Sequence, residues 1–149
     1  MNRVLFADRN FSVGAHKKGH LTERGQFYLM LGPPLERERF VTQSDIWPQE
    51  LWFYKGEPAY GLPAYFYLIF YQPDGIGDFR LFYPGIEGAE KLVIPSVYAE
   101  ARQMTLPADT LRKISAELAS ASKSYVAGEG GRAGLSSLSS VALIAGIKD

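Results

Sequence analysis

The segment AYFYLIFYQ (64–72) constrains the fold more than any other part of the sequence. In an extended chain, alternate residues point to opposite faces, and here both sets are apolar or aromatic. The segment therefore predicts a central strand that is covered on both sides. The turn signal PDGIG (73–77) and a second apolar run, DFRLFY (78–83), follow directly. Residues 64–83 thus predict an antiparallel hairpin.

Two further segments with strand character precede the hairpin. QFYLML (26–31) ends at GPP (32–34), and two prolines cannot continue the interior of a sheet. ELWFY (50–54) is rich in aromatic residues, which favour strands. We therefore expect a mostly antiparallel sheet of four or five strands.

Helices are predicted at both ends of the chain. RVLFADRNFS (3–12) has apolar residues at loosely helical spacing. In 108–127, apolar residues recur at steps of three and four, between Pro107 and Gly128. Residues 88–104 predict a short strand and then a helix. This order of elements indicates an α+β fold, with helices packed on one face of the sheet.

Length and composition restrict the class of protein. The 149 residues form one predicted domain (1–127, with helical cover over 96–127), followed by a flexible Gly/Ser-rich segment (128–149). The formal net charge is zero, which argues against nucleic acid as a partner. The chain has no cysteine, no visible signal peptide and no run near the ~18 apolar residues of a membrane span. We expect no cofactor and no metal.

Several pieces of the first half resemble the GWxTD domain family of bacterial proteins. They are RVLFADRNFS (3–12), GHLTE (19–23), RGQFYLMLGPP (24–34), PQELWFY (48–54) and IFYQPDGIGDFRLFY (69–83). The resemblance covers about residues 1–88, with His20 in place of the family's Trp and Glu23 in place of its Asp. It implies an exported or membrane-associated bacterial parent protein, in the periplasm or cell envelope, of which this chain is a piece. It implies no established reaction.

Two motifs near the N-terminus have simpler explanations than ligand binding. The GPP turn (32–34) lacks backbone N–H groups at both prolines, and no Gly-Lys-Ser/Thr follows, so it is not a phosphate-binding loop. His16 and His20 are four residues apart, a spacing that suits zinc on a helix. Glycines interrupt any helix there and the adjacent lysines repel a cation, so a polar loop is favoured.

Two groups of polar residues each allow a binding role or a purely structural role. Thr22, Glu23 and Arg24 form either a binding determinant or a polar staple that fixes the loop, and the staple is favoured. Asp74 and Asp78 flank a glycine-rich turn. A calcium site would need a longer ladder of aspartates, so a hairpin turn is favoured.

Aromatic residues are concentrated in one third of the chain, and most of them suit a core. Those on the second face of 64–72 either line a groove near Arg80 or are covered by the helix at 108–127. The binding candidates are His20, Thr22, Glu23, Arg24, Trp52, Tyr54, Tyr65, Tyr67 and Arg80.

The leading hypothesis is a non-enzymatic binding or assembly module whose partner is a protein or another domain of its parent. No nucleophile–base pair is visible, since the chain has two histidines, no cysteine and no Gly-x-Ser-x-Gly. The alternative is a hydrolase or enzyme accessory domain acting on peptide or glycan, which requires carboxylates such as Glu23, Glu50 and Asp74 to converge in a cleft. A third possibility is a purely structural domain.

Overall fold

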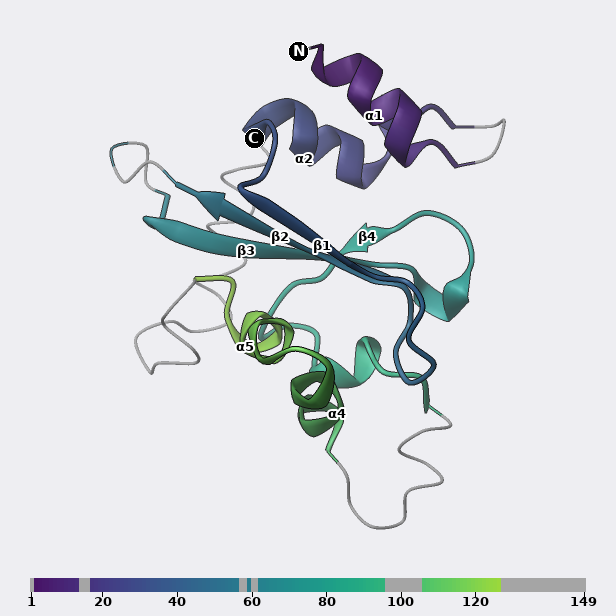
Figure 1. Ribbon diagram of the computed structural model, residues 1–149, viewed down its shortest axis with the longest axis vertical. Helices are drawn as coiled ribbons and strands as arrows, with labels where there is room; N and C mark the ends of the chain where they lie inside the picture. The colour runs from purple at the N-terminus through teal and green to yellow at the C-terminus, as the bar shows by residue number, and fades with distance from the viewer. Residues whose placement is uncertain (1, 14–16, 57–58, 60–61, 96–105, 127–149) are drawn as a thin grey trace.

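The chain folds around a four-stranded antiparallel sheet (Figure 1). The computed structural model describes residues 2–13, 17–56, 59, 62–95 and 106–126. The strands lie in sequence order in the sheet: β1 (Glu36–Phe40), β2 (Gln49–Lys55), β3 (Tyr65–Tyr71) and β4 (Arg80–Leu81). The predicted strands at 50–54 and 64–72 and the hairpin at 64–83 are confirmed as β2, β3 and the β3–β4 pair.

Helices cover both faces of this sheet, which makes three layers (Figure 1). α1 (Arg3–Phe11) and α2 (Glu23–Leu31) lie on one face, whereas α4 (Pro107–Ile114) and α5 (Ala116–Lys123) lie on the other. Within the described residues, three short 3-10 helices lie in the connections: η1 (Gly19–Leu21), η3 (Pro73–Gly75) and η4 (Ala89–Lys91). The α+β class is confirmed, but the helices occupy two faces and not one. No helix among the described residues is long and apolar enough to cross a membrane.

The two faces of β3 belong to two separate cores. Phe66, Leu68 and Phe70 pack in the cluster beneath α1 and α2. Ile69 and Tyr71 pack in the cluster that contains the apolar residues of α4 and α5. The alternation of apolar side chains in the sequence is therefore explained by a strand that is covered on both sides, as expected. Helices α4 and α5 cover the second face of β3, which is one of the two arrangements that the sequence left open.

The predicted strand at 26–31 is wrong, because these residues form most of α2. Thr22 begins the helix: its hydroxyl oxygen accepts a hydrogen bond from the Gly25 N–H (3.0 Å). Gly32, at φ 80°, ends the helix and donates its N–H to the carbonyl of Tyr28. The sheet gains its remaining strand from β1, whose sequence ERERF has no apolar alternation.

The predicted helix at 108–127 is broken into α4 and α5. Ser115 adopts an extended conformation, and its hydroxyl caps α5 by accepting a hydrogen bond from the Leu118 N–H (3.1 Å). After α5, Val126 forms a bridge to Phe66 of β3. The strand expected in 88–104 is reduced to a single bridge between Val93 and Ile46. The helix expected there, and the segment 128–149, lie outside the described residues.

Two glycines allow the N-terminal helices to approach each other closely. A Cβ on Gly19 would lie 1.6 Å from the carbonyl oxygen of Ala7, in α1. A Cβ on Gly25, in α2, would lie 1.9 Å from the carbonyl oxygen of Gly19. The chain therefore stacks α1, η1 and α2 backbone to backbone, which only glycine permits at these two positions.

We predict that Gly25→Ala destabilises the fold, although alanine is the better helix former by about 1 kcal/mol. The expected loss is about 3 kcal/mol in the free energy of unfolding, since the contact is with backbone that cannot rotate away. Urea denaturation measures it. Gly88→Ala is the control, because the atoms nearest its added Cβ belong to the flexible Glu90 side chain. Equal stability of the two variants would contradict the close-packing argument.

Candidate functional site

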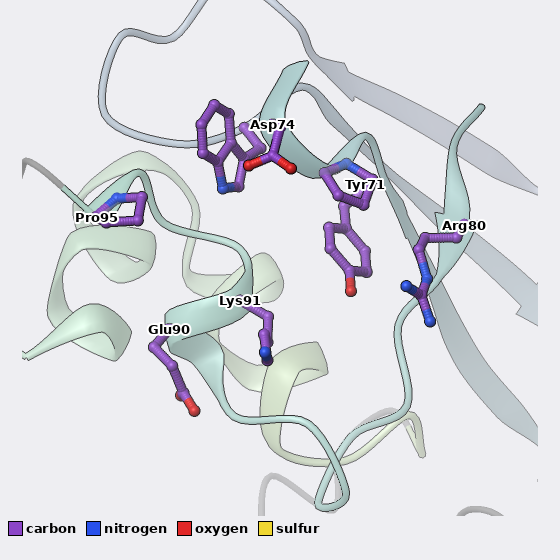
Figure 2. Close-up of a pocket in the computed structure, with 8 residues that line it drawn as sticks. Tyr71, Asp74, Arg80, Glu90, Lys91 and Pro95 are labelled. Atoms are coloured by element: carbon purple, nitrogen blue, oxygen red, sulfur yellow. The ribbon is translucent and has the colours of Figure 1, made fainter. Parts of the chain in front are cut away.

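A pocket of about 340 Å³ opens at one end of the sheet, on the face that carries α4 and α5 (Figure 2). Aromatic rings, prolines and charged side chains of both signs line it. The residues are Trp47, Tyr71, Pro73, Asp74, Arg80, Glu90, Lys91 and Pro95. Its volume lies at the small end of the range for ligand sites, so it holds a small molecule or one or two side chains of a partner.

Backbone pairing brings these residues together from four segments. Tyr71, the last residue of β3, lies directly opposite Arg80 of β4, so the two side chains share a face. The N–H of Trp47 donates to the carbonyl of Leu92 (3.1 Å), which places the segment that leads into β2 beside the end of η4. The Gln49 side chain donates to the same carbonyl (3.1 Å), a contact between residues 43 apart in the sequence.

The turn at η3 shapes one wall of the pocket. Asp74 has a φ of 59°, a left-handed conformation that aspartate tolerates better than most residues, and Gly75 follows at φ 74°. The ring of Trp47 packs beside this turn, since a Cβ on Gly75 would lie 3.8 Å from it. The segment is a hairpin turn, as expected. Among the described residues, no group of three or more His, Asp or Glu side chains is placed to hold a metal ion.

The charges of the pocket are unevenly distributed (Figure 2). Arg80 and Lys91 lie on either side of the Tyr71 hydroxyl, and Asp74 lies at the other end of that ring. Neither cation forms an ion pair within the part of the chain that is described. The guanidinium of Arg80 is 6.0 Å from the centre of the Tyr71 ring. Both cations therefore remain available to a ligand.

Tyr71 is held as a neutral phenol. Its hydroxyl donates a hydrogen bond to Glu87 (2.7 Å). Burial, together with this carboxylate, raises the pKa of Tyr71 well above its ordinary value. The residue thus contributes a rigid ring to the pocket wall and no base or nucleophile near neutral pH.

A second polar group, on the opposite face of the sheet, is built around Glu50 in β2. Glu50 is fully buried, with 0% of its side chain exposed. Its two oxygens accept hydrogen bonds from Arg24 (2.8 Å), Arg37 (2.8 and 3.0 Å) and Arg39 (3.1 Å). The indole N–H of Trp52 adds a further bond (2.9 Å).

These donors keep Glu50 charged despite its burial. Burial alone would raise its pKa, but the hydrogen bond from Arg37, the charge of Arg24 and the bond from Trp52 outweigh this effect. The pKa of Glu50 therefore lies below its ordinary value. The guanidinium of Arg24 is also packed against aromatic rings, 4.0 Å from the centre of Phe79 and 4.8 Å from that of Phe11.

The structure distributes the sequence-predicted site residues over several places. Arg80 lines the pocket. Arg24 and Trp52 belong to the group around Glu50. Tyr65 and Tyr67 pack with Phe53 on the α4/α5 face, away from the residues of the pocket, and Tyr65 is 44% exposed. Burial and nearby glutamates raise the pKa of Tyr67.

The residues of the GHLTE motif act locally. The Thr22 hydroxyl donates to the Gly19 carbonyl (2.6 Å) while it caps α2, and Glu23 occupies the first turn of that helix. The N–H and the Nδ1 atom of His20 both contact the Asp8 carboxylate (2.9 and 2.7 Å). The backbone bond from His20, supported by its ring, lowers the pKa of Asp8. His16 lies outside the described residues.

Most residues of the pocket were missed from the sequence. Trp47 and Lys91 come from segments whose spacing along the chain gives no sign of proximity, whereas Tyr71 belongs to the face of 64–72 for which a groove near Arg80 was one of two expectations. Asp74 was considered as a calcium ligand, which was not favoured, and as one of the carboxylates of the hydrolase alternative. The one available signal was an aromatic residue, Trp47, followed by proline and lying shortly before a predicted strand.

Comparison of the chain with family models, curated proteins and solved structures finds no match in any of the three.

We predict that Glu50→Gln lowers the free energy of unfolding by about 3–5 kcal/mol, because it leaves buried guanidinium groups without their counter-charge. The pKa of Glu50 is lower in the folded chain than its ordinary 4.5. Its contribution is therefore complete above that pH and is lost as the pH falls through the folded pKa. Denaturation of both proteins at pH 7 and pH 3 should show the difference shrinking in acid.

Glu38→Gln is the control, since Glu38 is an exposed glutamate of the neighbouring strand that forms no ion pair within the described residues. A change within about 0.5 kcal/mol is expected. A difference for Glu50→Gln that is as small as this, or that does not change with pH, would contradict the assignment.

Two buried tyrosines should respond oppositely to loss of the hydroxyl. The Tyr54 hydroxyl donates to the Gly32 carbonyl (2.8 Å), whereas the buried Tyr125 hydroxyl has no partner among the described residues. We predict that Tyr54→Phe destabilises the fold by about 1 kcal/mol and that Tyr125→Phe stabilises it by a similar amount. Thermal unfolding measures both, and a loss in Tyr125→Phe would show that its hydroxyl is satisfied.

Proposed function

We propose that this chain is a non-enzymatic binding module that takes one or two side chains of a protein partner into the pocket between Trp47 and Arg80. The observation that carries this proposal is the composition of the pocket. Aromatic rings and arginine are the side chains that contribute most to protein recognition. Here they combine with two prolines and with unpaired charges in one cavity.

The hydrolase alternative receives no support from the arrangement of carboxylates. Glu50 shares the α1/α2 core face with Trp52 and is fully enclosed by donors, whereas Asp74 lines the pocket on the other face. Glu23 begins α2, on the first of these faces. Of the carboxylates named for this alternative, Glu50 and Asp74 therefore do not meet in one cleft.

We further propose that the module belongs to an exported bacterial protein, in the periplasm or cell envelope, and that the partner is another protein or another domain of the same parent. The support is the resemblance of residues 1–88 to the GWxTD domain family. The structure gives the motif residues a local role: Thr22 caps α2 and Gly19 permits close helix packing. The binding function is accordingly assigned to the other face of the sheet.

A peptide library displayed on phage tests the proposed function. We predict that the protein selects peptides whose binding weakens at least about tenfold in Trp47→Ala and in Arg80→Gln, a loss of about 1.4 kcal/mol or more. Isothermal titration calorimetry gives the dissociation constants. Circular dichroism should show that both variants remain folded, since Trp47 is half-buried and Arg80 is exposed.

Arg112→Gln is the matched control, because it removes an exposed arginine from α4, outside the pocket. It should bind the selected peptides as well as the original protein does. Peptides that bind all variants equally, or a library that yields no binder, would contradict the proposed function.

A further inference from the structure

The three arginines around Glu50, here called the arginine cluster (Arg24, Arg37 and Arg39), outnumber the carboxylate that they share. Arg37 and Arg39 belong to β1 and lie on the same face of that strand, two residues apart. Arg39 pairs directly with Glu50 in the register of β1 and β2, and Arg37 pairs with Trp52. All three guanidinium groups contact the one carboxylate.

The surrounding charges do not compensate this excess. Asp78 acts on Arg24 through its charge, but it is itself paired with Lys17 (3.5 Å). Four cations and two carboxylates therefore meet here, which leaves two surplus positive charges. Repulsion between like charges in a partly buried group is costly, and a bound anion would relieve it.

A second observation, independent of the charge count, concerns hydrogen bonds that are not formed. The Nε–H of Arg24 is buried and has no partner among the described residues, although only 6% of the Arg24 side chain is exposed. Buried donors of this kind are rare in native proteins and call for an explanation. The cluster thus has spare donor capacity as well as spare charge.

The cluster is open to solvent on one side. The Arg39 side chain is 53% exposed and that of Arg37 is 21% exposed. Arg39 uses only its Nε toward Glu50, and within the described residues its two terminal nitrogens donate no hydrogen bond. β1 is an edge strand of the sheet, so a ligand can reach these groups from outside.

We propose that the arginine cluster is an oxyanion-binding site, in which a carboxylate or phosphate group is held by Arg39 and Arg37 at the exposed edge of the sheet. The planar fork of N–H donors on arginine matches the oxygen pairs of both groups. The site lies on the face opposite the pocket, so it does not depend on the proposed function. The bound group comes either from a phosphorylated molecule or from a carboxylic acid, such as an acidic side chain.

Thermal unfolding in the presence of simple anions tests this site. The probes are inorganic phosphate and, in a separate series, acetate, each against chloride at constant ionic strength. A ligand that binds only the native state raises the melting temperature as its concentration increases. We expect such a rise in the original protein and a rise at least about threefold smaller in Arg39→Gln.

Arg112→Gln is the control, because Arg112 has the same 53% exposure and one carboxylate partner but lies in α4. It should keep the full rise. A rise with phosphate alone assigns the site to phosphates, and a rise with acetate as well extends it to carboxylates. No rise with either anion, or an equal rise in Arg39→Gln, would overturn the proposal. Either result leaves the peptide-binding experiment at the pocket unaffected.

Discussion

The burial of one charged group, Glu50, is the constraint on which the rest of the structure depends. A carboxylate removed from water is costly unless charged donors surround it. Here the donors come from α2, β1 and β2, so the requirement fixes the position of α2 on the sheet and the register of β1 against β2. The close contacts at Gly19 and Gly25 then hold α1 against α2. The buried part of the sheet face under these two helices thus has a structural role.

The opposite face carries the pocket proposed for recognition of a protein partner. The pocket there is formed by the ends of strands and by loops, where residues can change without disturbing the core. Its walls are rigid, because Tyr71 is tied to Glu87 and Trp47 is fixed by the pairing of its backbone with Leu92. Rigid rings that line a small cavity lower the entropy cost of binding. The carboxylates Glu50 and Asp74, which the hydrolase alternative would bring together, lie on opposite faces of the sheet.

The sequence predicts those elements whose pattern is local. The hairpin at 64–83 was recognised because both faces of β3 are apolar and a strong turn signal follows. The run at 26–31 was misread, since six apolar residues fit a strand or a helix, and the decision lies with the cap at Thr22 and the close contact at Gly25. β1 was missed because its arginines are paired with Glu50, a partner supplied by the tertiary fold. Of the pocket, only Arg80 was among the predicted candidates, because its walls come from segments that the fold brings together.

The two tryptophans of the chain report on the two faces separately. Trp47 lines the pocket, and the indole N–H of Trp52 is bonded to Glu50 beneath the N-terminal helices. The most direct test is therefore to follow the two indole N–H signals by NMR during titration with a selected peptide. Binding at the pocket predicts that the Trp47 signal shifts while the Trp52 signal stays in place. A shift of the Trp52 signal with Trp47 unchanged would contradict the assignment of recognition to the pocket.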